Sequence, residues 1–284
     1  MFLKIIPIHS YLFMNRNKIY LLLNMKICIP SYNRYETIQH KSIKFLLNAG
    51  YEASEIDVFV ADQEQYDLYK EKMDGDISII IAVKGLREVR DFIFNYYDQG
   101  ENLLCLDDDI EDVRECYLND DNKLRLRSIT NVKEIVDKGF DLCVTKKRKL
   151  WGLYPCPNNA MWMNSQKEFT WDYKFIIGNF FGVINCKNMN KLSVPDIDDY
   201  ERSIRSYVLY GGSVRMNHLS AKTKFRKNTG GQQDTSNRQE LIDNSKEILL
   251  NTYPNLIYLR KRKSDTNPML KDRRTLEQHF NNVC

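Results

Sequence analysis

The sequence lacks any long uninterrupted hydrophobic run. Its first 24 residues carry apolar patches, but Lys4, Arg16 and Lys18 interrupt them, so no span of about 20 apolar residues exists. A membrane helix is therefore not expected, and without a small-residue cleavage site after an apolar core a signal peptide is not expected either. We predict that the fold begins at Met25, with residues 1–24 as an extension or a mis-assigned start. The expected location is cytoplasmic or nuclear, without secretion.

Cysteine and histidine are also scarce, with 7 and 4 residues. No Cys-x-x-Cys spacing occurs, which argues against a zinc ribbon. The number of cysteines is odd, and Cys28, Cys105 and Cys143 lie inside apolar runs, which indicates reduced core thiols and a reducing compartment. No internal repeat or low-complexity linker appears.

What the chain does contain is enough for a substantial core. Hydrophobic residues make up 43% of its 284 residues, which suits one large domain or two small ones in a globular soluble protein. The net charge of +4, from 42 basic and 38 acidic residues, is mild. Its distribution is more informative, because basic residues cluster at 146–149, 222–227 and 260–263 while acidic residues gather near the centre of the sequence.

The first 110 residues alternate strand and helix signals. Apolar runs of strand length alternate with stretches of helical spacing. The predicted strands are 26–30, 56–61, 77–83 and 103–106. One predicted helix follows the first strand and ends near residue 48, and two more span 66–73 and 86–97. Strands that are apolar on both faces are typical of parallel sheets, so we predict an α/β fold with an open, mostly parallel, doubly wound sheet.

After residue 110 the pattern is looser. It predicts helices over 131–138, 198–210 and 238–251, and strands over 141–145, 213–219 and 256–260. Residues 150–163 are expected to form a loop rich in Trp, Pro and Asn. The apolar run 175–186 is broken by Gly178 and Gly182, which suggests a strand pair or one bent strand.

The most informative stretch is 102–112, NLLCLDDDIED, in which an apolar strand ends in three carboxylates. Ligands of open α/β sheets gather beyond the carboxyl ends of the strands. Alternation along a strand would place Asp107 and Asp109 on one face, about 7 Å apart, and Asp108 on the other. Such a pair can share Mg²⁺ or Mn²⁺ that holds a diphosphate. The alternative is a helix cap or a solvated turn.

Five polar or charged segments follow one another along the chain: ICIPSYNR, KGLREVR, LLCLDDDI, IDDYE and MNH. In this order they resemble the GT-A glycosyltransferases over about residues 25–233, which leaves 234–284 as a helical and basic C-terminal extension. More narrowly, LDDDI, WGLYP, IGNFFGVIN and NHLSAKTKF with the later GG resemble the TET/JBP-associated DNA-base glycosyltransferases. That resemblance implies transfer of a sugar, with glucose expected, from a UDP-sugar to hydroxymethylated pyrimidine in DNA of a virus, phage or protist.

The resemblance implies a nucleotide-sugar site around the first strand-to-helix turn. Its expected residues are Pro30, Ser31, Tyr32, Asn33, Arg34, Asp62, Arg87, Arg90, Asp107, Asp108, Lys222 and Lys224. Arg87 and Arg90 lie about one turn apart near a helix N-terminus, where the dipole favours anions. An ordinary turn, a helix cap at Asp62 and a solvated arginine face are the alternatives for these residues.

A cation is expected to bind Asp107 and Asp109, with His218 as the third ligand that the family commonly supplies. A single histidine on a strand is otherwise a structural residue. The basic residues that follow, Lys222, Lys224, Arg226 and Lys227, are expected either to clamp the diphosphate or to contact a phosphate backbone. A solvated basic loop is the third possibility.

Transfer also requires a base that removes the proton of the acceptor hydroxyl. Asp198 and Asp199 occupy the place of the Glu-Asp pair of inverting GT-A enzymes, and Asp199 matches its second member, the base. A helix N-cap would explain the same residues without catalysis. A retaining route would not need this base.

The acceptor is expected to contact an aromatic and amide-rich loop that includes Trp151, Tyr154, Asn158 and Asn159. Such a loop could stack on a flipped base or bind a sugar, and it could equally be plain packing. By physics alone a DNA and a glycan acceptor are equally compatible, and the family resemblance favours DNA. A glycan or protein acceptor is the first alternative, and an inactive nucleotide-sugar-binding module is the second.

Overall fold

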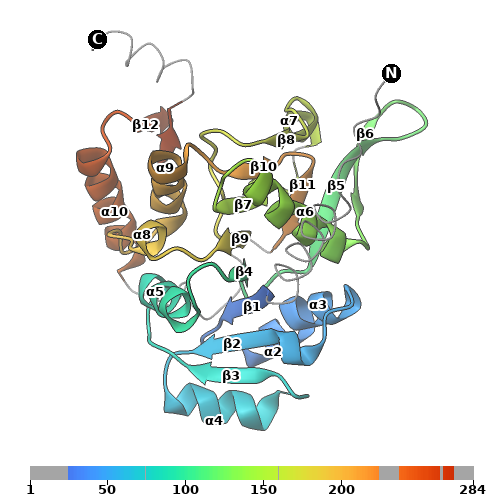
Figure 1. Ribbon diagram of the computed structural model, residues 1–284, viewed down its shortest axis with the longest axis vertical. Coiled ribbons are helices and arrows are strands. Elements are labelled where there is room, and N and C mark those ends of the chain that lie inside the picture. Colours follow the sequence, from blue (N-terminus) through green and yellow to red (C-terminus); the bar gives the residue numbers. More distant parts are fainter. Residues whose placement is uncertain (1–24, 74, 159, 224–236, 263–264, 272–284) are drawn as a thin grey trace, which may run out of the picture.

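The structure is a computed structural model that describes residues 25–73, 75–158, 160–223, 237–262 and 265–271 (Figure 1). An eight-stranded sheet has the order β3-β2-β1-β4-β9-β7-β10-β8. Its strands are β1 (Met25–Pro30), β2 (Ile56–Val60), β3 (Ser78–Ile81), β4 (Asn102–Leu106), β7 (Leu150–Leu153), β8 (Phe169–Thr170), β9 (Phe180–Ile184) and β10 (Val214–Met216). Only β8 and β9 run opposite to the rest. The predicted α/β class with an open, mostly parallel sheet is confirmed.

The first half follows the predicted order of elements. The connecting helices are α2 (Tyr35–Ile38), the π-helical turn η1 (Gln39–Ile43), α3 (Lys44–Asn48), the 3-10 turn η2 (Ala53–Glu55), α4 (Gln63–Lys72) and α5 (Leu86–Tyr96). α2, η1 and α3 form one continuous helical segment, and Gly50 follows it with a φ of +84°. A left-handed residue after a helix end is the usual place for glycine.

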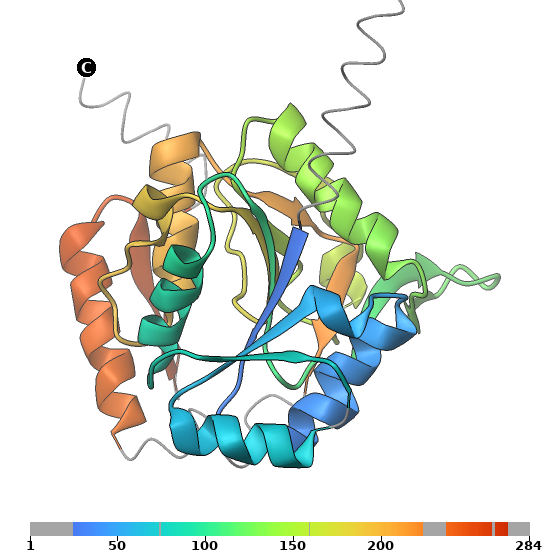
Figure 2. The same ribbon diagram turned by 60° about the horizontal axis from the view of Figure 1, so that its bottom comes forward.

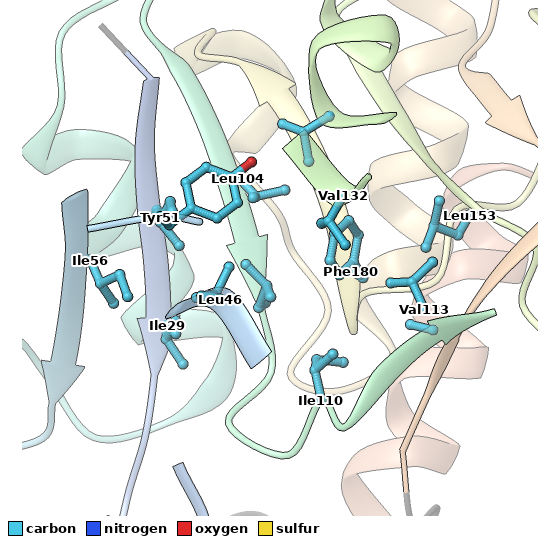
Figure 3. Packing of buried hydrophobic residues seen from close by; sticks show 14 of the residues in the cluster. Ile29, Leu46, Tyr51, Ile56, Leu104, Ile110, Val113, Val132, Leu153 and Phe180 are labelled. Atoms are coloured by element: carbon cyan, nitrogen blue, oxygen red, sulfur yellow. The ribbon is translucent and has the colours of Figure 1, made fainter. Parts of the chain in front are cut away.

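Helices cover both faces of the sheet. The segment α2–α3 and α6 (Val132–Thr145) lie on one side, and α5, α9 and α10 lie on the other (Figures 1 and 2). On the first side, Ile29, Leu104 and Phe180 join Leu46 of α3 in one buried cluster (Figure 3). The second side buries Cys28 and Cys105 against α5, which confirms that these cysteines are core residues.

Trp151 belongs to this core. Its side chain is 0% exposed, and it packs against Gly139 of α6 and Gly182 of β9, where any Cβ would overlap the indole. The prediction that Trp151 lies on an acceptor-binding loop is therefore wrong. Residues 150–163 contain β7 and α7 (Ala160–Asn164) rather than one long loop.

Two other local predictions are also wrong, and one sheet was not predicted. Residues 141–145 continue α6, because Val136, Phe140 and Cys143 are buried at helical spacing. Residues 175–179 precede a single strand, β9, instead of pairing as a strand. A second, three-stranded sheet of β11 (Leu219–Lys222), β5 (Asp112–Leu118) and β6 (Leu124–Ser128) was not expected, and its β5–β6 hairpin projects from the body (Figures 1 and 2).

The C-terminal elements pack beside the sheet. They are α8 (Lys187–Asn190), α9 (Asp198–Tyr210), α10 (Arg238–Thr252), β12 (Ile257–Arg262) and β13 (Asp265–Leu270). Ile204 of α9, Leu249 of α10 and Ile257 of β12 share a small buried cluster. Among the residues described, no helix is long and apolar enough to cross a membrane.

Candidate active site

The three aspartates form a tightly held turn at the carboxyl end of β4, which we call the carboxylate edge (residues 107–109). The amide of Asp107 donates to the Asn179 carbonyl over 3.0 Å. Ser42 donates its hydroxyl to the Asp107 carbonyl (2.7 Å) and accepts from the Ile110 amide (2.9 Å). Because β4 ends at Leu106, strand alternation does not decide where these carboxylates point, contrary to the prediction.

Asp108 is the buried member of the carboxylate edge. Only 6% of the residue is exposed. It accepts hydrogen bonds from the Ser31 hydroxyl and from Arg34 Nη1, both over 2.9 Å, and Tyr69 shares a hydrogen bond of 2.7 Å with Ser31. Burial raises the pKa of Tyr69 to about 12, so it remains a neutral phenol. Asp108 thus ties the first turn to β4.

Asp107 is more open, with 39% of its side chain exposed. Arg90 Nη2 lies 3.4 Å from its carboxylate. The pKa of Asp107 is raised to about 7, because desolvation of the carboxyl and the charges of Asp109 and Asp108 together outweigh the opposing charge of Arg90. An acid that repels its neighbours in this way gains from a bound cation.

The N-terminus of α9 supplies two more carboxylates. Asp198 is 2% exposed and accepts hydrogen bonds from Arg90 and Arg202. Burial alone would raise the pKa of Asp198, but Arg202 and Arg90 hold it below its ordinary value. Asp199 is half-buried, and burial together with the charge of Asp198 raises its pKa to about 7.

Arg90 connects these two regions. Its Nη1 donates to Asp198, while its Nη2 donates to the Gly178 carbonyl over 2.9 Å and lies beside Asp107. The guanidinium is buried, and the carboxylates that surround it raise its pKa despite the desolvation. Arg90 is therefore a permanent cation between the carboxylate edge and α9.

The first turn, after Pro30 at the end of β1, brings several predicted nucleotide-binding residues together. Asn33 is left-handed with a φ of +54°, and Gln65 fixes it by accepting from its amide (2.8 Å) and donating to its side chain (2.6 Å). Lys84 lies 5.0 Å above the Tyr32 ring. The turn is thus rigid and carries a cation over an aromatic face.

Two of the predicted nucleotide-binding residues have other partners here. Asp62 accepts from the Gln65 amide over 2.9 Å and caps α4, which was the alternative considered for it. Arg87 pairs with Glu88 over 2.5 Å.

His218 is not brought to the carboxylate edge. It lies in the turn between β10 and β11, four residues before Lys222, which is about 13 Å along a strand. Its Nε2 is 3.7 Å from Glu168, and its ring meets Phe169 edge-on. Lys222, by contrast, is close, because it pairs with Glu111 over 2.9 Å. Lys224, Arg226 and Lys227 lie outside the described residues.

The remaining acceptor candidates are dispersed. Tyr154 is half-buried and packs under the Arg215 guanidinium at 5.2 Å, and Asn158 is exposed. Asn159 lies outside the described residues. A different aromatic pair is formed by Tyr200, which follows Asp199 in the chain, and Phe175, with ring centroids 4.5 Å apart.

The carboxylate edge fits a divalent cation of the hard, oxygen-binding type. Mg²⁺ and Mn²⁺ take carboxylate oxygens, and Mg²⁺ typically uses one or two of them together with water and substrate phosphates. Asp107 and Asp109 supply that number, and their mutual repulsion raises the pKa of Asp107. Within the described ranges no three Asp, Glu, His or Cys side chains form a metal cluster, so the predicted set of three protein ligands, Asp107, Asp109 and His218, is not assembled.

Arg202 was overlooked in the sequence. It is 1% exposed and reaches Asp198 from one helical turn away. The i, i+4 spacing of Asp198 and Arg202 within DDYER was visible, but it usually marks an exposed surface pair. The carbonyl of Gly178, which accepts from Arg90, carries no signal in the sequence.

No protein-family model matches the chain, and no curated protein matches it significantly. Among solved structures, the chain is similar to *S. aureus* TarS residues 1–349 at 15% identity and a TM-score of 0.43, covering 70% of this chain and 59% of that one. It is also similar to a mycobacterial protein at 7% identity and a TM-score of 0.48, covering 88% and 86%.

A third similar structure is glucosyl-3-phosphoglycerate synthase from *Mycobacterium tuberculosis* in complex with Mn²⁺, UDP and glucosyl-3-phosphoglycerate. The identity is 10%, the TM-score is 0.45 and the coverage is 87% of each chain. The chain spans less than two thirds of the TarS structure. Since all three TM-scores are below 0.5, function is inferred from the geometry of the site.

Proposed function

We propose that the chain is a metal-dependent glycosyltransferase of the GT-A type that uses a UDP-sugar. The observation that carries the proposal is the convergence of the carboxylate edge, the first turn and the N-terminus of α9. Ser31 and Arg34 reach Asp108, and Arg90 joins Asp107 to Asp198. An open acidic site beside a rigid turn at the carboxyl ends of parallel strands is where a nucleotide diphosphate binds in this class of sheet.

The donor side is assigned to the first turn and the carboxylate edge. Asp107 and Asp109 would hold Mn²⁺ or Mg²⁺, which when bound neutralises charge on the diphosphate leaving group. Arg90 fixes the orientation of Asp107. Tyr32, Asn33 and Arg34 form the wall for the nucleoside, with Lys84 as an additional cation.

The acceptor side is assigned to Asp199. A pKa of about 7 suits a carboxylate that accepts a proton from a hydroxyl near neutral pH. Asp198 cannot share that role, because both of its oxygens are engaged by arginines and its pKa is depressed. The acceptor hydroxyl therefore gives its proton to Asp199 as its oxygen bonds to the anomeric carbon and the diphosphate departs.

The proposed acceptor is hydroxymethylated pyrimidine in DNA, with glucose as the sugar. This part is supported by the resemblance of LDDDI, WGLYP and IGNFFGVIN to the DNA-base glycosyltransferases. A glycan or protein acceptor is distinguished by the absence of salt-sensitive duplex binding, since contacts to phosphates release counterions.

The test is transfer from UDP-glucose with Mn²⁺ to duplex DNA that carries 5-hydroxymethylcytosine or 5-hydroxymethyluracil, followed as a mass increase of one hexose. Asp109→Ala should abolish both transfer and UDP-glucose hydrolysis with the fold intact. Asp121→Ala is the matched control, because this aspartate lies on the β5–β6 hairpin with 70% of its side chain exposed. Turnover that survives Asp109→Ala would refute the assignment of Asp109 as a metal ligand, and absence of both transfer and hydrolysis in the wild-type chain would refute the enzyme assignment.

A further inference from the structure

A buried cluster of three charges lies behind the proposed site, and we call it the arginine–aspartate triad: Arg90, Asp198 and Arg202. Their side chains are 8%, 2% and 1% exposed. Asp198 uses one carboxylate oxygen for Arg90 and the other for Arg202. Two cations thus share one anion away from solvent. Burying these charges costs desolvation free energy, which an arrangement that fixes a geometry can justify.

Arg202 contacts the site through Asp198. Its Nε and Nη1 have no hydrogen-bond partner in the described part of the chain, and its guanidinium lies over the rings of Phe181 (4.5 Å) and Phe94 (6.0 Å). Among the residues that the structure describes, Asp198 is thus the one anion to which Arg202 donates a hydrogen bond. Phe181 belongs to β9 and Phe94 to α5, so Arg202 anchors α9 to both elements.

The other end of the triad reaches the carboxylate edge. Arg90 is tied to Asp198 through Nη1 and to both Gly178 and Asp107 through Nη2. Neighbouring backbone points are pinned too, since the Ile176 amide donates to the Ser203 hydroxyl over 2.9 Å. The chain from Arg202 to Asp107 is thus a continuous series of contacts from α9 to the end of β4.

We infer that Arg202 is a positioning residue that acts through Asp198 and Arg90 to hold Asp199 in register with the carboxylate edge. Asp199 is fixed to the same helix start as Asp198, so a shift of Asp198 moves the candidate base relative to the donor. Binding of Mn²⁺ and UDP depends on the first turn and the carboxylate edge, which Arg202 does not touch. Substitution of Arg202 should therefore lower kcat for transfer without changing the affinity for Mn²⁺ and UDP. This inference rests on the proposed function.

The test compares Arg202→Met with Arg202→Lys. The methionine keeps the volume and removes the charge, so transfer to the hydroxymethylated duplex should fall about 30-fold or more in kcat. The affinity for Mn²⁺ and UDP, measured by calorimetry, should stay within about threefold. The lysine variant keeps the charge next to Asp198 and should recover part of kcat. Arg205→Met is the matched control, because Arg205 lies on the same helix and donates to the Met189 carbonyl.

The double variant Asp198→Asn/Arg202→Met addresses folding, since it removes the anion together with one of its cations. It should fold and still transfer slowly, because Arg90 keeps at most a neutral hydrogen bond to α9 in place of its ion pair. Full recovery of transfer in the double variant, or wild-type kcat in Arg202→Met, would overturn the positioning role, as would parallel loss of binding and transfer. Absence of both UDP binding and transfer in the wild-type chain would instead refute the proposed function.

Discussion

The carboxylate edge and the N-terminus of α9 each contain two adjacent aspartates in different environments. In each region one aspartate is buried and paired with arginine, Asp108 with Arg34 and Asp198 with Arg90 and Arg202. The neighbour in each region, Asp107 or Asp199, has a pKa raised to about 7.

The regions differ in how the buried aspartate is neutralised. Asp108 has one arginine and a serine hydroxyl, close to the first turn. Asp198 has two buried arginines, one on each carboxylate oxygen. The comparison teaches that adjacent aspartates can differ in environment, with one member held by arginine and the other left with a raised pKa.

The largest expected effect is on transfer in Asp199→Asn. If Asp199 removes the acceptor proton, kcat should fall by about 10²- to 10⁴-fold. Binding of Mn²⁺ and UDP should not change, which calorimetry can check. A fall in binding that equals the fall in kcat would place Asp199 on the donor side and remove the contrast with Asp107.

The next effect is on stability in Asp198→Asn. This change leaves two buried arginines without an anion, and breaking a buried pair in this way costs about 3–5 kcal/mol. Urea denaturation should therefore show a much larger loss than for Asp199→Asn. Equal stability of the two variants would mean that Asp198 and Asp199 do not differ in their structural role.

A smaller effect is expected for Ser31→Ala. The hydroxyl bonds a carboxylate and Tyr69, so the loss should be about 1.5–3 kcal/mol. Arg34 still neutralises Asp108, which is why the cost stays below that of Asp198→Asn. Denaturation of both variants under one buffer condition gives the comparison, and Ser165→Ala on an exposed hydroxyl is the control.

The smallest effect is a pH dependence of stability. Asp107 and Asp199 bind protons more tightly in the folded than in the unfolded chain, so their contribution to the free energy of unfolding falls as the pH rises from about 4 to 7. Solvent screening at the open Asp107 limits its size. Mn²⁺ should offset the part of the trend that comes from Asp107, because it would bind the ionised carboxylate of this residue.

The pH experiment compares wild-type chain with Asp107→Asn/Asp199→Asn from pH 4 to 8, with and without Mn²⁺. The double variant should lack both the decline and its offset by Mn²⁺. An identical pH profile for the two proteins would contradict the raised pKa values.

The first four strands of the parallel sheet and the location of the carboxylate edge could be predicted from sequence, because apolar runs and polar turns are local signals. Cys28 and Leu104 are buried where the pattern placed them. The errors fall after residue 110, where long-range packing decides. Trp151 looked like a surface aromatic, but Gly139 and Gly182 leave space for it inside.

The proximity of several candidate residues was also predictable, while their roles stay predictions. Asp107, Asp108, Arg34 and Arg90 converge as expected, since each follows the carboxyl end of a strand or lies in the helix beside it. His218 was misplaced, because it lies in the turn before β11, and the length of that strand separates it from Lys222 and the carboxylate edge. The arginine–aspartate triad depends on a contact between residues 90 and 198, and no local pattern encodes a separation of that length.

The residue before α9 has an unfavourable backbone conformation. Ile197 has a φ of +48°, a left-handed conformation that costs a non-glycine residue about 1–2 kcal/mol. A chain selected only for thermal robustness would favour glycine there. A branched side chain at the start of α9 restricts the backbone conformations that orient Asp198 and Asp199. Substitutions that raise thermal stability should therefore be placed at other turns, such as the tip of the β5–β6 hairpin at Asn122.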